Sequence, residues 1–162
     1  MNLNDLHKAS WDISHHGESL SHRRHLFDFR VIHERAVMVT REQDDPSPLE
    51  QGQSYALRCR FHPVRRHGSQ ERPVSDVDFP AWLSELLVRN GMQLLVLRQS
   101  IRDSVPMPRF YGKEKDVRMH TMLASFTVNI QDAAKAAYAW QHGIGRRKAF
   151  GCGMLLMGGK GQ

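Results

Sequence analysis

The sequence has few of the features that would place a protein in a membrane or in the secretory pathway. No apolar stretch approaches the roughly 20 residues that a membrane-spanning helix needs, and the polar N-terminus, with Asn2, Asn4 and Asp5, is unlike a signal peptide. The two cysteines, Cys59 and Cys152, lie in apolar runs without metal-ligand spacing, which indicates buried thiols in a reducing compartment. We therefore expect a soluble cytoplasmic protein that does not contact a membrane.

Acidic residues are also in the minority. There are 23 Lys and Arg against 17 Asp and Glu, which gives a formal net charge of +6, and 10 histidines are present besides. A basic surface suits a polyanion, chiefly nucleic acid, although generic solubility would also account for the charge. No pair of acidic residues indicates a catalytic metal site, which argues against a metal-dependent DNA nuclease. We expect no cofactor.

The periodicity of the apolar residues predicts an α+β fold. Alternation of apolar and polar residues predicts strands, and helical spacing of the apolar residues predicts helices. The expected strands are 26–32, 36–40, 55–62, 92–97, 121–130 and 149–157, and the expected helices are 3–13, 79–90 and 132–142. The last six of these elements follow the order β-α-β twice, which is the ferredoxin-like pattern that RNA-recognition modules also use. Residues 44–48 break structure and divide the chain into predicted domains at 1–50 and 51–162.

The glycine-rich loop, residues 143–153, is the most distinctive stretch of the chain. Its sequence is Gly-Ile-Gly-Arg-Arg-Lys-Ala-Phe-Gly-Cys-Gly, so glycines bracket three consecutive cations. Glycine allows positive φ, and consecutive backbone N–H groups in such a loop form a concavity that suits phosphate oxygens. A nucleotide P-loop follows a strand and precedes a helix, whereas here an apolar strand is expected after the loop. The backbone of a polymer therefore fits this loop better than a nucleoside triphosphate does.

The expected phosphate contacts of the loop are Gly143, Gly145, Arg146, Arg147, Lys148, Gly151 and Gly153. The alternative is a solvated turn between a helix and a strand.

This loop, with the helix before it and the strand after it, resembles the C-terminal signature of the RAMP superfamily of CRISPR proteins. Further segments resemble the CasE family, the endoribonucleases that process crRNA in type I-E Cascade: Leu6-His7-Lys8 with Trp11, and residues 26–29, 55–63 and 82–83. The resemblance implies ferredoxin-like domains in tandem. Only six residues precede His7, where the family has a strand, so we expect either a reduced N-terminal domain or a true start upstream of Met1.

The resemblance also implies a reaction and a catalytic residue. The family cleaves a CRISPR repeat at the 3′ base of its hairpin without a metal, and leaves a 2′,3′-cyclic phosphate and a 5′-hydroxyl end. A histidine can act as base or acid at neutral pH, and His7 matches the family's catalytic histidine; a surface histidine is the alternative. Asn4 stands where some members have a tyrosine, so no tyrosine role is carried over. His15 and His16 have no carboxylate or cysteine at ligand spacing, and no metal is expected there.

Basic residues elsewhere are expected to contact the RNA stem. The family places a basic hairpin against the base of the stem, and the basic loop at 109–118 matches it. Alternation in 55–62 is expected to put two arginines on one strand face, opposite a buried apolar face. The cluster at 22–25 adds two arginines as phosphate contacts. The residues assigned in this way are Arg23, Arg24, Arg58, Arg60, Arg109, Lys113, Lys115 and Arg118.

Three functions remain open from the sequence. The first is an endoribonuclease that matures crRNA and stays bound to the 3′ hairpin as a subunit of a Cascade-like complex, which the retained His7 favours. The second is a catalytically inactive subunit that binds the RNA hairpin, which Asn4 and the missing strand favour. The third is an unrelated ferredoxin-like RNA-binding module. In the first two cases the expected partners are the repeat stem-loop and the other subunits of the complex.

Overall fold

The computed structural model describes residues 5, 6, 8–10, 25–32, 35–42, 44–106 and 118–158. The strands are β1 (His25–Ile32), β2 (Arg35–Glu42), β3 (Ser54–Phe61), β4 (Val64–His67), β5 (Gln70–Pro73), β6 (Met92–Pro106), β7 (Arg118–Ile130) and β8 (Leu156–Met157). The helices are α2 (Phe79–Arg89), α3 (Ala133–His142) and the short 3-10 helix η1 (Lys148–Phe150). Residues 5, 6 and 8–10 are helical as well, within the helix expected at 3–13.

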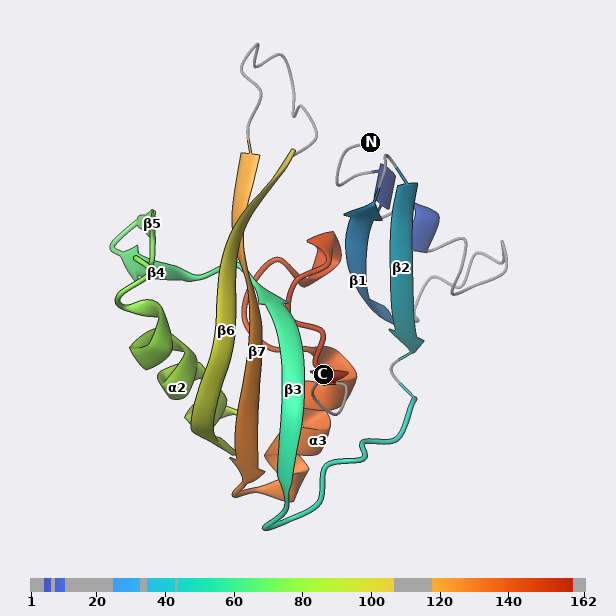
Figure 1. The fold of residues 1–162 in the computed structure, drawn as a ribbon, viewed down its shortest axis with the longest axis vertical. Coiled ribbons are helices and arrows are strands. Elements are labelled where there is room, and N and C mark those ends of the chain that lie inside the picture. Colours follow the sequence, from blue (N-terminus) through green and yellow to red (C-terminus); the bar gives the residue numbers. More distant parts are fainter. Residues whose placement is uncertain are drawn as a thin grey trace.

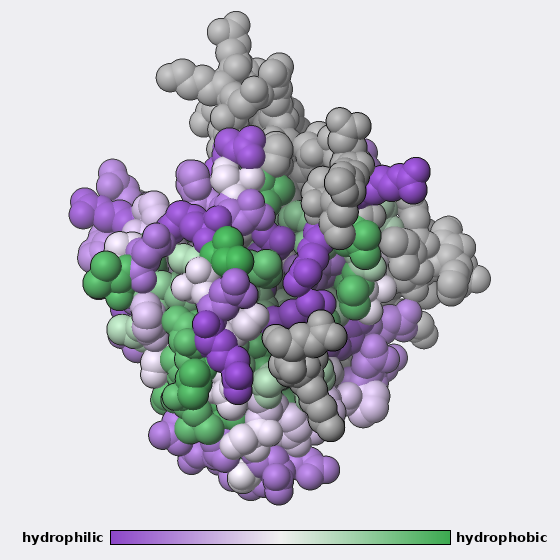
Figure 2. All heavy atoms as spheres, viewed as in Figure 1, coloured by the Kyte–Doolittle hydropathy of each residue, from purple (hydrophilic) through white to green (hydrophobic). Residues whose placement is uncertain are grey.

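Four strands form one antiparallel sheet in the order β6-β7-β3-β8 (Figure 1). The units β3-α2-β6 and β7-α3-β8 each place their first strand in the centre of the sheet and their second strand at an edge. This order is the ferredoxin-like arrangement, so the predicted α+β fold class is confirmed. The helices cover one face of the sheet, and Figure 2 shows the other face, where hydrophilic residues are interspersed with apolar ones.

The main core lies between the sheet and the two helices. Strand β3 contributes Leu57, Cys59 and Phe61, each 1% exposed, and β7 contributes every second residue between 122 and 130. The apolar stripe of α2 packs on them, and the ring of Phe61 meets that of Trp82 edge-on at 5.8 Å. The alternating and helical patterns of the sequence therefore produce the packed faces that they predict.

The β1–β2 hairpin forms a separate two-stranded sheet that packs against the glycine-rich loop. Phe27 and Phe29 on β1 lie in a cluster with Cys152 of the loop. From β2 the buried guanidinium of Arg41 donates to the carbonyls of Trp140 (3.0 Å) and Leu155 (2.7 Å), and stacks on the Trp140 ring. Burial lowers the pKa of Arg41 to about 10, which leaves it charged at neutral pH. The chain on either side of the loop is thereby fixed to the hairpin.

Two strands differ from those expected. Strand β6 continues to Pro106 instead of ending at Leu97, because its polar half is held by pairing with β7 after two register shifts between residues 94 and 99. The strand expected at 149–157 is wrong over most of its length. Only Leu156 and Met157 pair with β3, since Gly151 and Gly153 have φ of 80° and 85°, which breaks an extended strand.

Gly153→Ala tests how closely the loop closes on itself. A Cβ at position 153 would overlap the carbonyl oxygen of Ile144, whereas a Cβ at Gly52 would meet nothing within 4 Å. Both glycines have positive φ, 85° and 76°, so Gly52→Ala has similar backbone strain without the overlap. We expect Gly153→Ala to lower the free energy of unfolding by about 1–3 kcal/mol more than Gly52→Ala does. Urea unfolding of both variants measures this difference, and equal losses would show that the overlap is relieved at no cost.

Candidate nucleic-acid interface

The C-terminal half of the glycine-rich loop is used for packing. The N–H groups of Gly151, Cys152 and Gly153 donate to the carbonyls of Lys148 (3.2 Å), Arg147 (3.3 Å) and Arg60 (2.7 Å), respectively. A Cβ on Gly151 would lie 2.8 Å from the ring of Phe29, so only glycine lets the loop approach β1 this closely. These glycines were expected to present N–H groups to phosphate; in the structure their N–H groups already have acceptors.

The N-terminal half of the loop is different. Gly143 ends α3 with φ of 74° and donates to the carbonyl of Ala139 (2.8 Å). Beyond it, the N–H groups of Gly145, Arg146 and Arg147 have no acceptor within the described part of the chain. Gly145 has φ of 77°, and Arg147 has φ of 61°, the one positive value of a non-glycine residue among those described. Backbone turned in this way points successive N–H groups toward a common centre, as in anion-binding nests.

The side chains around these three N–H groups are basic. Arg146 and Arg147 are exposed, and both face one carboxylate: Arg146 forms an ion pair with Glu71 on β5, and Arg147 lies 3.9 Å from the second oxygen of Glu71. Both pairs are partly exposed, so each is worth little in water. A phosphate could replace Glu71 at either arginine at small cost.

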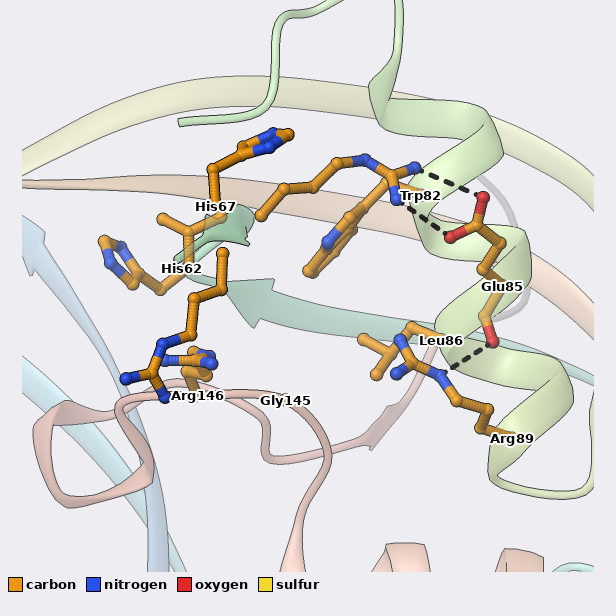
Figure 3. Close-up of a pocket in the computed structure, with 11 residues that line it drawn as sticks. His62, His67, Trp82, Glu85, Leu86, Arg89, Gly145 and Arg146 are labelled. Atoms are coloured by element: carbon orange, nitrogen blue, oxygen red, sulfur yellow. Dashed lines mark hydrogen bonds and ion pairs between the residues drawn. The ribbon is translucent and has the colours of Figure 1, made fainter. Parts of the chain in front are cut away.

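The loop forms one wall of a cleft of about 520 Å³ (Figure 3). The β4–β5 ribbon and α2 form the other walls, with Trp82 and Leu86 between them. The cations and histidines that line it come from all three walls: His62, Arg65, Arg66, His67, Arg89 and Arg146. The one carboxylate in the lining, Glu85, binds Arg65 through two hydrogen bonds of 3.1 and 3.2 Å. The cleft therefore keeps an excess of positive charge, which suits a polyanion.

His62 lies in the cleft next to the loop. Its Nδ1 is 2.8 Å from the carbonyl oxygen of His120, which can only accept, so Nδ1 carries a proton and Nε2 is the atom that titrates. Burial lowers the pKa of His62, the hydrogen bond to His120 opposes this, and the charges of Arg147 and Arg146 lower the pKa further. His62 is therefore neutral at pH 7.

Arg60 occupies the centre of the interface between the two sheets. Its side chain is 3% exposed, and it donates to Asp103 (2.9 Å), Thr121 (3.1 Å) and the carbonyl of Phe29 (3.0 Å). Its Nε lies 3.5 Å from the buried carboxylate of Asp28. A basic face that presents Arg60 to solvent was expected, and this is wrong, because β1 covers this part of β3.

Comparison with known proteins places this fold and this loop in one family. A family model described as CRISPR associated protein matches residues 21–158. The chain belongs to this family. The sequence has no significant match among curated proteins.

Three solved structures share the fold. A CRISPR endoribonuclease Cse3 bound to a 19-nucleotide RNA has 19% identity and a TM-score of 0.77, and 97% of this chain and 90% of that chain are covered. The CRISPR-associated protein Cas6e from Escherichia coli K-12 has 21% identity and a TM-score of 0.66, with 96% and 91% covered. A chain of a CRISPR RNA-guided surveillance complex has 20% identity and a TM-score of 0.67, with 96% and 92% covered. At these identities the likeness establishes the fold of the CRISPR-associated family for this chain.

The remaining assigned residues lie in different parts of the chain. Gly145 and Arg146 line the cleft, Arg147 follows them in the loop, and Arg58 lies half-buried on the open face of the sheet. Arg118 begins β7 rather than lying in a loop, and its guanidinium donates to the hydroxyl (2.7 Å) and carbonyl (2.6 Å) of Ser104. Outside the described residues lie His7, Arg23, Arg24, Arg109, Lys113 and Lys115.

The cleft also contains basic residues that are not among the RNA contacts assigned from the sequence. Residues 65–69 belong to the β4–β5 ribbon, which turns at Gly68 with φ of 61°. The consecutive Arg65 and Arg66 are the sequence signal that could have identified this wall of the cleft. Within the described residues, no three metal-ligating side chains come together, and no helix is long and apolar enough to cross a bilayer.

Arg60→Leu tests the buried connection between the sheets. The substitution leaves the carboxylate of Asp28, 7% exposed, without its cation. We expect a loss of about 3–5 kcal/mol in the free energy of unfolding, and partial recovery when Asp28→Asn is added. Arg98→Leu, which removes an exposed arginine with one hydrogen bond to Thr127, is the matched control and should cost much less. An equal loss in both variants would contradict the proposed role of Arg60.

His62 gives the fold a predictable pH dependence. Its pKa in the folded chain is below the unfolded value of about 6.5. Between these two pKa values the unfolded chain therefore binds more protons than the folded chain does. The free energy of unfolding should therefore decrease as pH falls through about 6.5 and level off below the folded pKa. His62→Asn keeps a donor for the His120 carbonyl and should make this decrease shallower, which urea unfolding at several pH values measures. An unchanged slope would assign the pH dependence to other histidines.

Proposed function

We propose that this chain binds the stem-loop of a CRISPR repeat RNA and cleaves it at the 3′ base of the stem. The observation that carries the proposal is the open half of the glycine-rich loop, where the N–H groups of Gly145, Arg146 and Arg147 have no acceptor in the described part of the chain and lie beside a basic cleft. Such a site suits the phosphates of a nucleic-acid backbone. Membership of the CRISPR-associated family and the likeness to Cse3 bound to RNA support the choice of RNA.

The proposed reaction needs proton transfer and no metal. The 2′-hydroxyl upstream of the scissile phosphate loses its proton and its oxygen bonds to phosphorus. The bond from phosphorus to the 5′-oxygen breaks, and that oxygen gains a proton, so the products are a 2′,3′-cyclic phosphate and a 5′-hydroxyl. The resemblance to the CasE family assigns His7 to one of these transfers, a role that suits the ordinary pKa of histidine.

The RNA is proposed to stay bound after cleavage. Phosphate contacts position a duplex stem without reading its sequence, and the proposed contacts include the loop cations and the basic segment with Arg109, Lys113 and Lys115. Retention of the hairpin would make the chain a subunit of a Cascade-like complex, which the likeness to a chain of a surveillance complex supports. In this proposal 1–50 is a reduced ferredoxin-like domain with the catalytic histidine, and 51–162 binds the hairpin.

An inactive hairpin-binding subunit is the second candidate. Asn4 favours it, because Asn4 stands at the position of the tyrosine that some relatives have. The two candidates differ in chemistry and agree in RNA binding.

Incubation of the protein with its cognate repeat hairpin in EDTA separates them. We expect cleavage by the wild type, a cyclic phosphate on the 5′ product, and a rate about 10²–10⁴-fold lower in His7→Ala. His142→Ala removes a histidine from the end of α3 and should leave the rate unchanged. Tight binding without cleavage by the wild type would establish the inactive subunit, and absence of binding would overturn both candidates.

A further inference from the structure

A second hollow, of about 430 Å³, lies on the open face of the four-stranded sheet, between the sheet and β1. Three strands contribute to it in register. Gln99 on β6, Ser125 on β7 and Arg58 on β3 form one row across the sheet. The next row, Ile101, Leu123 and Arg60, forms the neighbouring part of the floor. Since residues paired in this way share a face, the rows put polar and apolar groups side by side.

Two arginines of this hollow have no partner in the part of the chain that the structure describes. Arg58 is half-buried, and its Nε is fully buried without a hydrogen-bond acceptor. Arg30 reaches the hollow from β1, and it is exposed. Neither guanidinium has a carboxylate or an acceptor among the described residues, unlike Arg65, Arg102 and Arg146, which all do. A guanidinium that has no carboxylate or acceptor from the protein keeps its remaining N–H donors for a ligand, so an anionic ligand with acceptor oxygens would be stabilised here.

The carboxylate of the hollow does not cancel this charge. Asp103 accepts from Arg60 at 2.9 Å and from the N–H of Ser104 at 2.7 Å. Burial acts to raise the pKa of Asp103, but these hydrogen bonds outweigh it and lower the pKa, so the group is ionised at neutral pH. Arg60 is shared between Asp103 and the buried Asp28, so the three arginines at the hollow exceed the two carboxylates by one charge, and neither carboxylate contacts Arg30 or Arg58.

The residues of this face indicate which form of RNA fits. RNA-recognition modules stack unpaired bases on aromatic rings of their open sheet. In the described part of the chain the corresponding positions of β3 and β7 hold no aromatic residue: Ser54, Ala56, Arg58, Arg60, Thr121, Leu123, Ser125, Thr127 and Asn129. Arginine planes and apolar side chains can take that role, with Gln99 and Ser125 as hydrogen-bonding groups. A hollow of about 430 Å³ admits a nucleotide but not a duplex stem.

We propose that this hollow, lined by Arg30, Arg58, Gln99 and Ser125, binds a nucleotide of an unpaired RNA segment that adjoins the repeat hairpin. The inference rests on the proposed RNA binding and adds a second site to it. The loop and its cleft lie toward the helical side of the sheet, where Gly145 is next to Leu86 of α2, whereas the hollow lies on the opposite face. One RNA molecule would thus be held at two places, the stem at the loop and the flanking strand across the sheet.

Binding of three RNA probes tests the proposal: the hairpin alone, the hairpin with an unpaired extension at either end, and the unpaired strand alone. Each probe carries a 2′-deoxy nucleotide at the scissile position to prevent cleavage. Arg58→Gln and Arg30→Gln are compared with Lys135→Gln, which removes a cation from α3 next to Asp132. Dissociation constants are measured at several salt concentrations, and circular dichroism of each variant checks the fold.

We expect an extension at one end to tighten binding to the wild type. Arg58→Gln and Arg30→Gln should each weaken binding of that extended probe by about tenfold, which is typical of one lost charge-assisted hydrogen bond. The salt slope on the extended probe should fall by about 0.7 for each phosphate contact removed. The hairpin alone should bind all variants equally, and Lys135→Gln should behave as the wild type.

Two results would overturn the inference: no gain from either extension in the wild type, or equal weakening of all probes by Arg58→Gln and Arg30→Gln. Failure of the proposed function is recognised separately, because the hairpin alone would then not bind. In that case, binding of the unpaired strand that is lost in Arg58→Gln would still support a site for unpaired RNA in the hollow.

Discussion

The buried guanidinium of Arg60 is the contact on which the arrangement of this molecule depends. From β3 it reaches Asp28 and the Phe29 carbonyl on β1, Asp103 on β6 and Thr121 on β7. Its own carbonyl accepts the N–H of Gly153, so the glycine-rich loop is held at the same residue. Charges buried in this way are costly unless each is paired. The two sheets and the loop therefore have one mutual position in which Arg60 keeps its ion pairs with Asp28 and Asp103 and its hydrogen bonds to Thr121 and Phe29.

This constraint divides the glycine-rich loop into two parts with different tasks. Residues 151–153 close against β1 and β3, and their N–H groups are satisfied inside the fold. Residues 145–147 lie at the basic cleft, which Gly145 and Arg146 line, and their N–H groups have no acceptor in the described structure. Rigid attachment of one half holds the other in place, so a phosphate that binds there does not have to order the loop first. Preorganisation of this kind makes a binding site strong.

Sequence patterns predict the helices and strands that are determined by the spacing of apolar residues within the segment itself. Alternation at 55–62 and 121–130 and the apolar stripe at 79–90 place three core elements within three residues of their observed ends. The polar half of β6 and the break at Gly151 could not be predicted, since pairing with β7 and packing against Phe29 decide them. Arg58 and Arg60 are the same residue type, and they lie two positions apart on the same face of β3. Their different exposure depends on β1, a strand distant in sequence, so the pattern could not separate a ligand contact from a core residue.

The central claim is that RNA phosphates bind the open half of the loop, and backbone amide spectra test it most directly. An ¹⁵N-labelled sample of this 18.7 kDa chain would be titrated with a repeat hairpin made uncleavable by a 2′-deoxy nucleotide. The account predicts that the amide signals of Gly145, Arg146 and Arg147 move downfield as their N–H groups find acceptors, while that of Gly153, already bonded to Arg60, changes little. Unchanged signals at 145–147 together with large shifts elsewhere would contradict it, and would move the RNA backbone to another surface.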